Sequence, residues 1–183
     1  MRSFPSAKDL QGSRGGPDKE PAGSGMPDLI PGAFEKEGPS VQLQVFTLGY
    51  EGRELADVLR AVRAHGIEEV LDVRENASSR KKGFDATSLK ERLSGMGVRY
   101  VHSAELGCER ASRHDLWKGG SPHAFFDAYR RRLAEHPKAV EELVRWARAS
   151  RCLLLCLERE VSRCHRRVLG EVLREHGFLV QDL

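Results

Sequence analysis

The sequence predicts a three-layer α/β domain, in which a largely parallel sheet of about five strands is flanked by helices. Two observations carry this prediction. Short β-rich runs alternate with helical segments of roughly 10 to 15 residues from residue 41 onward, which is typical of βαβ units. The chain has 183 residues, 39% of them hydrophobic and 31% charged, which suits one soluble globular domain with a sizeable core.

Residues 1–40 differ in composition from the rest of the chain. They are rich in Gly, Pro and Ser and show no hydrophobic period. Such a segment buries too little apolar area to offset the entropy of ordering, so we expect a disordered tail followed by a single domain over residues 41–183. Met26 is an alternative candidate for the true start of translation.

The first half of the domain contains three predicted strands and two predicted helices. Apolar residues at helical spacing and a following Gly66 mark the first helix, and Asp85 or Thr87 supplies the N-cap of the second. We predict strands over residues 41–48, 69–74 and 98–101, and helices over residues 53–65 and 85–96.

The second half begins with a long polar connection, residues 102–120. Ser121-Pro122 then opens a helix, because Pro is favoured in the first turn. We predict helices over residues 121–133, 138–149 and 161–176, and strands over residues 152–157 and 178–182.

Bulk properties exclude some classes of protein. No apolar run approaches the roughly 18 to 20 residues that span a bilayer, and the N-terminus lacks the apolar core of a secretory signal. The four Cys residues are therefore predicted to be reduced thiols, and we expect a cytoplasmic protein without a membrane partner. A net charge of +3 is too small to indicate a strongly basic nucleic-acid binder. The oligomeric state is not indicated.

Candidate functional residues follow the predicted strands. In a parallel sheet, ligands bind beyond the carboxyl ends of the strands, so these residues are expected at one edge. The first strand ends in Gly49-Tyr50-Glu51-Gly52, where glycine permits either a tight turn or the close approach of a ligand. The second ends in Asp72-Val73-Arg74, which is read either as an acid/base group beside an anion-binding guanidinium or as a structural ion pair.

A basic loop, residues 79–84, lies beyond the second strand. It offers Arg80 and, at its end, the aromatic ring of Phe84. A cation beside a ring suits phosphate contact and base stacking, although a solvated loop has the same composition. His102 and Glu105 follow the third strand, in a loop that is either surface or part of a cleft.

The fourth strand ends in Cys156-Leu157-Glu158, and Cys164-His165-Arg166 opens the following helix. Three interpretations of the two Cys residues stay open. They are zinc ligands, a thiolate nucleophile, or small buried packing groups beside functional Glu158, His165 and Arg166. Zinc sites favour pairs spaced by two to four residues, so the seven intervening residues argue against a metal, and no cofactor is indicated.

The ordered series of these motifs resembles the domain-of-unknown-function 488 family of small bacterial and archaeal proteins. The similarity covers roughly residues 44–183, and Ala104 and Cys108 depart from the family's usual Pro and Gly. The resemblance implies an α/β fold with a signature cleft at the same sheet edge. It implies no reaction.

We therefore expect an enzyme that binds an anionic substrate, a nucleotide or nucleic-acid component, in a cleft at the carboxyl edge of the sheet. The expected acid/base groups are Asp72, Glu158, His165, His102 and Glu105. The expected substrate-binding residues are Gly49, Tyr50, Gly52, Arg74, Arg80, Phe84 and Arg166. The alternatives are a non-catalytic nucleic-acid-binding module and a thiol-dependent, sulfur-transfer-like enzyme that uses Cys156 or Cys164.

Overall fold

A five-stranded, all-parallel sheet forms the centre of the molecule. The computed structural model describes residues 43–183, so the predicted tail, the alternative start at Met26 and the first two residues of the first predicted strand lie outside the described residues. The strand order is β3-β2-β4-β1-β5. The strands are β1 (Gln44–Gly49), β2 (Glu69–Asp72), β3 (Arg99–His102), β4 (Cys152–Cys156) and β5 (Leu179–Asp182).

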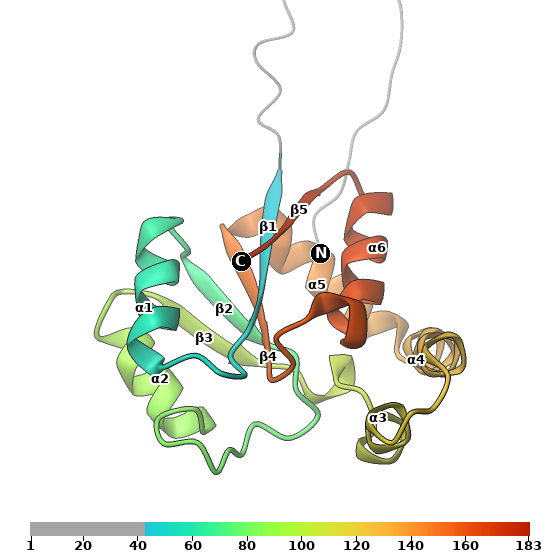
Figure 1. The fold of residues 1–183 in the computed structure, drawn as a ribbon. Coiled ribbons are helices and arrows are strands. Elements are labelled where there is room, and N and C mark those ends of the chain that lie inside the picture. The colour runs from blue at the N-terminus through green and yellow to red at the C-terminus, as the bar shows by residue number, and fades with distance from the viewer. Residues whose placement is uncertain (1–42) are drawn as a thin grey trace, which may run out of the picture. The chain divides into compact units, whose positions relative to one another are not determined.

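Helices cover both faces of this sheet, which confirms the predicted three-layer α/β fold (Figure 1). One face, which we call the α1–α2 face, packs against α1 (Leu55–Ala64) and α2 (Ala86–Ser94). The other, the α3–α6 face, packs against four helices. These are α3 (Arg110–Trp117), α4 (Pro122–Glu135), α5 (Pro137–Ala149) and α6 (Arg166–Glu175).

Side-chain caps fix the starts of two helices. The Asp85 carboxylate accepts a hydrogen bond from the Ser88 backbone N–H at 3.0 Å at the start of α2. The Ser121 hydroxyl accepts one from the Ala124 N–H at 3.4 Å at the start of α4, where Pro122 occupies the first turn. Both starts agree with the capping signals in the sequence. Within residues 43–183, no helix has both the length and the apolarity to cross a membrane.

The long connection predicted over residues 102–120 is wrong in part, because it contains two helical elements. A 3₁₀ turn, η1, spans Ala104–Leu106, and α3 follows it. Leu116 is the buried residue of α3, and most of its other residues are exposed. A helix that buries so little apolar surface leaves almost no hydrophobic period for the sequence to show.

The helix predicted over residues 161–176 is also interrupted at its start. Residues Val161–Arg163 form a 3₁₀ turn, η2, and Cys164 then takes an extended conformation with φ −127° and ψ 144° before α6 begins. This break separates Cys164 and His165 from the regular helix. It allows both side chains to turn back toward the end of β4.

Candidate functional site

The predicted site residues gather at the carboxyl edge of the sheet, but on two different faces of it. Asp72 and Arg74 contact side chains of the α1–α2 face. Cys156, Cys164 and their neighbours belong to the α3–α6 face. Side chains alternate between the faces along a strand, so Glu158 and His165 lie together while Asp72 and Arg74 lie on the other face of the sheet.

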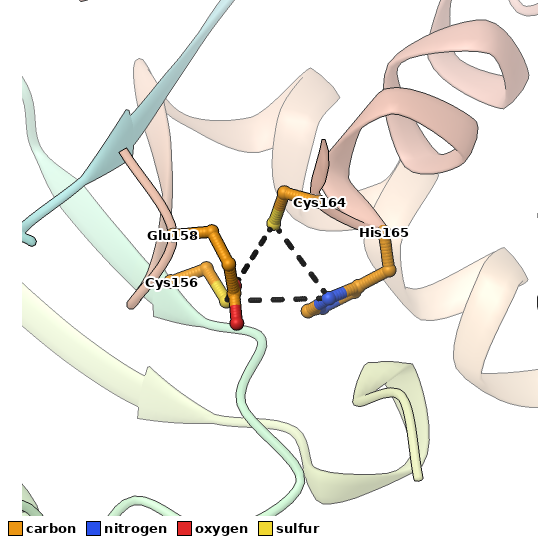
Figure 2. Close-up of side chains that lie close together, drawn as sticks. All are labelled: Cys156, Glu158, Cys164 and His165. Atoms are coloured by element: carbon orange, nitrogen blue, oxygen red, sulfur yellow. Dashed lines mark hydrogen bonds between the residues drawn. The ribbon is translucent and has the colours of Figure 1, made fainter. Parts of the chain in front are cut away.

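Four side chains meet on the α3–α6 face, and we call them the Cys–Glu–Cys–His cluster: Cys156, Glu158, Cys164 and His165. Figure 2 shows the first two coming from the end of β4 and the other two from the segment before α6. The Cys156 Sγ lies 2.9 Å and the Cys164 Sγ 3.3 Å from Glu158 Oε2. The His165 Nδ1 lies 3.8 Å from Cys164 Sγ and 4.0 Å from Cys156 Sγ.

The His165 ring is held in one orientation. Its Nε2 atom lies 2.8 Å from the carbonyl oxygen of Val73 at the end of β2, and it donates there because a carbonyl can only accept. The Tyr129 ring packs against it edge-on, with the centroids 5.1 Å apart. In the neutral ring, Nδ1 then presents its lone pair to the two sulfurs.

Arg166 is buried behind the cluster and has no exposed surface. Its Nε donates to Cys164 Sγ at 3.2 Å, and its Nη2 donates to the backbone oxygen of Glu158 at 2.5 Å. Its Nη1 donates to Thr47 Oγ1 at 3.3 Å and lies 3.6 Å from an Asp182 carboxylate oxygen. A substrate would have to displace these partners, so the geometry favours a structural role for this guanidinium.

Burial and close contact shift the pKa values within the cluster. Burial raises the pKa of Glu158, and the charge on Cys164 adds to that shift. Burial also raises the pKa of Cys156 well above its usual value. For Cys164, burial acts in the same direction, but the hydrogen bond from Cys156 and the positive charges of His165 and Arg166 outweigh it and lower the pKa. Burial lowers the pKa of His165, but Cys164 and Cys108 more than offset it.

Glu158 carries an incompletely satisfied carboxylate. Its Oε1 atom is buried and has no hydrogen-bond partner among the described residues, and the Arg113 Nε atom lies 3.8 Å away. Only 4% of the residue is exposed. A buried carboxylate oxygen without a donor is costly, so this atom is available to a ligand that could enter the cluster.

The Asp72–Arg74 pair is fully engaged on the α1–α2 face. Arg74 donates from Nε to Asp72 Oδ1 at 2.7 Å and from Nη2 to Asp72 Oδ2. Its Nη1 donates to Tyr50 Oη and to the Phe84 carbonyl at 2.8 and 2.9 Å, and Tyr100 Oη donates to Asp72 at 2.6 Å. Burial opposes the charge on Arg74, but the Asp72 carboxylate more than offsets it and raises the pKa. The geometry favours the structural-pair interpretation.

Tyr50 and Phe84 stack on each other rather than facing solvent. Their centroids are 4.3 Å apart with an interplanar angle of 15°, and both residues are buried. Base stacking on either ring would require this pair to separate. Gly49 has a packing role, because a Cβ there would lie 1.8 Å from the Glu158 carbonyl oxygen.

A surface groove of about 530 Å³ lies beside these residues on the α1–α2 face. Arg80 is exposed and lines this groove. Arg159 stands at its rim, with Nη1 3.7 Å from a Cβ placed on Gly52. The lining residues are Tyr50, Glu51, Gly52, Ser78, Ser79, Arg80, Lys81 and Leu157.

His102 and Glu105 are exposed and lie outside both the cluster and the groove lining. His102 Nε2 contacts the Arg74 carbonyl oxygen at 2.8 Å. The adjacent Gly107 packs against the backbone of Glu75, where a Cβ would lie 2.2 Å from the Glu75 nitrogen. This close approach accounts for the glycine after Glu105-Leu106.

Three residues near these sites were missed by the sequence reasoning. Arg113 comes from the unpredicted helix α3, Tyr129 reads as an ordinary core residue of α4, and Arg159 follows Glu158 in a charged turn. Only Arg159 had a usable signal, because it directly follows a predicted site residue at the sheet edge.

Comparison with known proteins identifies the family alone. No curated protein and no solved structure matches the chain. The family model described as "Domain of unknown function DUF488" matches residues 54–173, which include Arg80, Arg159 and the whole Cys–Glu–Cys–His cluster. Since that match covers more than half of the 183 residues, the chain belongs to the DUF488 family.

Proposed function

We propose that this protein binds a phosphate-bearing small molecule, such as a nucleotide, in the groove at the carboxyl edge of the sheet. The observation that carries the proposal is the exposed Arg80 and Arg159 at one groove, beside the open backbone of Gly52. Guanidinium groups bind phosphate oxygens through paired, charge-assisted hydrogen bonds. The position also agrees with the general rule for ligands in parallel α/β sheets.

The remainder of the groove suits the same class of ligand. Ser78 and Ser79 offer hydroxyl groups, and Leu157 provides an apolar wall. The volume of about 530 Å³ falls within the roughly 300 to 1,000 Å³ of small-molecule sites. Lys81 is partly committed elsewhere, because its Nζ contacts the Arg53 carbonyl and lies 3.7 Å from Glu54.

Acid/base catalysis stays a prediction for the five residues named from the sequence, since none of them lines the groove. The carboxylate that does line it is Glu51, an exposed residue whose Oε2 accepts a hydrogen bond from the Arg159 N–H at 3.2 Å. Glu51 is therefore the acid/base candidate in contact with a bound ligand.

Binding of a fluorescent ADP analogue, measured by anisotropy, tests the proposal. Arg80→Ala and Arg159→Ala should each weaken binding about tenfold, because each removes a charge-assisted contact worth about 1.4 kcal/mol or more. Arg145→Ala is the matched control, since it removes an exposed arginine of α5, and it should bind like the wild type.

The competing outcomes are distinct. Equal affinity in all three variants, or no binding at all, would contradict the proposal. Tighter binding of single-stranded DNA than of ADP, with a steep salt dependence, would favour the nucleic-acid-binding module instead.

A thiol-dependent enzyme is the second candidate. The lowered pKa of Cys164 beside His165 favours it, because the thiolate is the nucleophilic form. Its burial opposes it, since Cys156 has no exposed surface and Cys164 is only 1% exposed. A substrate would reach either sulfur only after the surrounding side chains moved.

A further inference from the structure

We propose that Cys156, Glu158, Cys164 and His165 form a binding site for a single Zn²⁺ ion that ties the end of β4 to the start of α6. The proposal is independent of ligand binding in the groove. It rests on the positions of the four donor atoms, on the surrounding groups that hydrogen-bond to the ligands, and on the net charge of the buried ligands.

The donor atoms have the spacing of one coordination sphere. All four lie within 4.8 Å of one another, and the individual contacts run from 2.9 to 4.0 Å. Zinc bonds of about 2.3 Å to sulfur and 2.0 to 2.2 Å to nitrogen and oxygen put tetrahedral ligands roughly 3.3 to 3.8 Å apart. Shifts of about half an ångström would therefore complete the site. Two thiols, one imidazole and one carboxylate are a zinc-type donor set.

Groups around the cluster hydrogen-bond to its ligands and orient them, as the residues surrounding the ligands do in known metal sites. The Val73 carbonyl takes the Nε2–H of His165, which leaves Nδ1 as the coordinating atom. Arg166 Nε contacts Cys164 Sγ at 3.2 Å, and it would stabilise that sulfur as a thiolate. Glu158 Oε2 lies 2.9 Å from Cys156 Sγ and 3.3 Å from Cys164 Sγ, so it is the carboxylate oxygen that lies among the other donor atoms.

Charge balance favours the same occupant. Two thiolates and one carboxylate carry three negative charges in a region from which water is largely excluded. A divalent ion and the buried Arg166 guanidinium together supply three positive charges. Burial of the anionic ligands without a compensating cation would be strongly unfavourable. Because all four ligands are protein groups and buried, the site is of the closed, structural kind.

The sequence argument against zinc rested on the seven residues between Cys156 and Cys164. In the structure, this segment supplies a ligand of its own, Glu158, and then reverses direction through η2. The Cys164 N–H donates to the Val161 carbonyl at 3.1 Å, which closes the turn. The spacing is therefore Cys-x-Glu-x₅-Cys-His, and the two-residue spacing of zinc ribbons is not needed.

The test is the zinc content of the full chain, purified under reducing conditions from zinc-supplemented medium without chelator. The wild type should hold about one zinc ion per chain, and Cys156→Ser and Cys164→Ser should each keep less than about a tenth of it. Cys152→Ser is the matched control, because Cys152 is a buried thiol of the same strand outside the cluster. It should keep its zinc.

Cobalt substitution keeps the test valid if a Cys variant fails to fold. Co²⁺ added to the zinc-free native chain should give tetrahedral ligand-field bands and a thiolate charge-transfer band, and one equivalent of Zn²⁺ should remove both. Native protein that binds neither ion, or Cys156→Ser and Cys164→Ser variants that keep full zinc content, would overturn the proposal. So would rapid alkylation of Cys164 that excess Zn²⁺ does not slow, an outcome that supports the thiol enzyme.

Discussion

Single glycine residues decide how closely the segments at the sheet edge approach one another. Gly49 is the last residue of β1 and packs against the backbone of Glu158 and Arg159. A Cβ at this position would overlap the Glu158 carbonyl. The turn motif at residues 49–52 therefore combines a packing requirement at Gly49 with an open groove surface at Gly52. The sequence predicted the importance of both glycines without separating the two reasons.

Gly49→Ala is predicted to destabilise the protein by about 3 kcal/mol or more, because the obstacle is backbone rather than a flexible side chain. Chemical denaturation followed by circular dichroism measures the free energy of unfolding. Gly95→Ala is the control, since its nearest contact would be an ordinary 3.5 Å and its φ is −64°. Comparable stability of the two variants would show that the edge can relax around an added methyl group.

At the scale of elements, the ends of β2 and β4 each serve both faces of the sheet. Asp72 and Arg74 lie on the α1–α2 face, whereas the Val73 carbonyl between them holds His165 on the other. A rigid Asp72–Arg74 pair would therefore fix the carbonyl that orients the histidine. This arrangement gives the buried Asp72–Arg74 pair a structural role at the sheet edge, and that role requires no contact between the pair and a ligand.

Arg74→Ala is predicted to cost about 3 to 5 kcal/mol of stability, because it leaves the buried Asp72 carboxylate without its cation. Arg60→Ala, which removes an exposed arginine paired with Asp57, should change stability by less than about 0.5 kcal/mol. Thermal and urea unfolding of both variants give the comparison. A small effect of Arg74→Ala, together with weakened ADP binding, would restore the substrate-binding role predicted for this residue.

For the whole molecule, the sequence predicted the strand order in the chain, the parallel sheet and the edge at which functional residues gather. It did not predict which face each residue would occupy. Asp72 and Glu158 follow adjacent strands, and only the pairing register between β2 and β4 shows that they point apart. The sequence placed Cys156, Glu158, Cys164 and His165 at one edge of the sheet. It did not show that they form one cluster, because the local motif spacing does not reveal the broken helix start at Cys164.

Arg80 and Arg159 show the same limit at the groove. They are far apart in the chain, at residues 80 and 159, and they come to one groove because β4, which precedes Arg159, lies between β2 and β1 in the sheet. The basic loop containing Arg80 was recognisable from its composition. The composition around Arg159 did not distinguish it, and its one signal was its position directly after the predicted site residue Glu158.

The most direct test of the central claim is a crystal structure of the protein with ADP. The account predicts that the diphosphate lies in the groove, with oxygen atoms within hydrogen-bond distance of both Arg80 and Arg159. ADP bound at another surface, or a groove left empty in crystals whose ADP occupies a different site, would contradict the account.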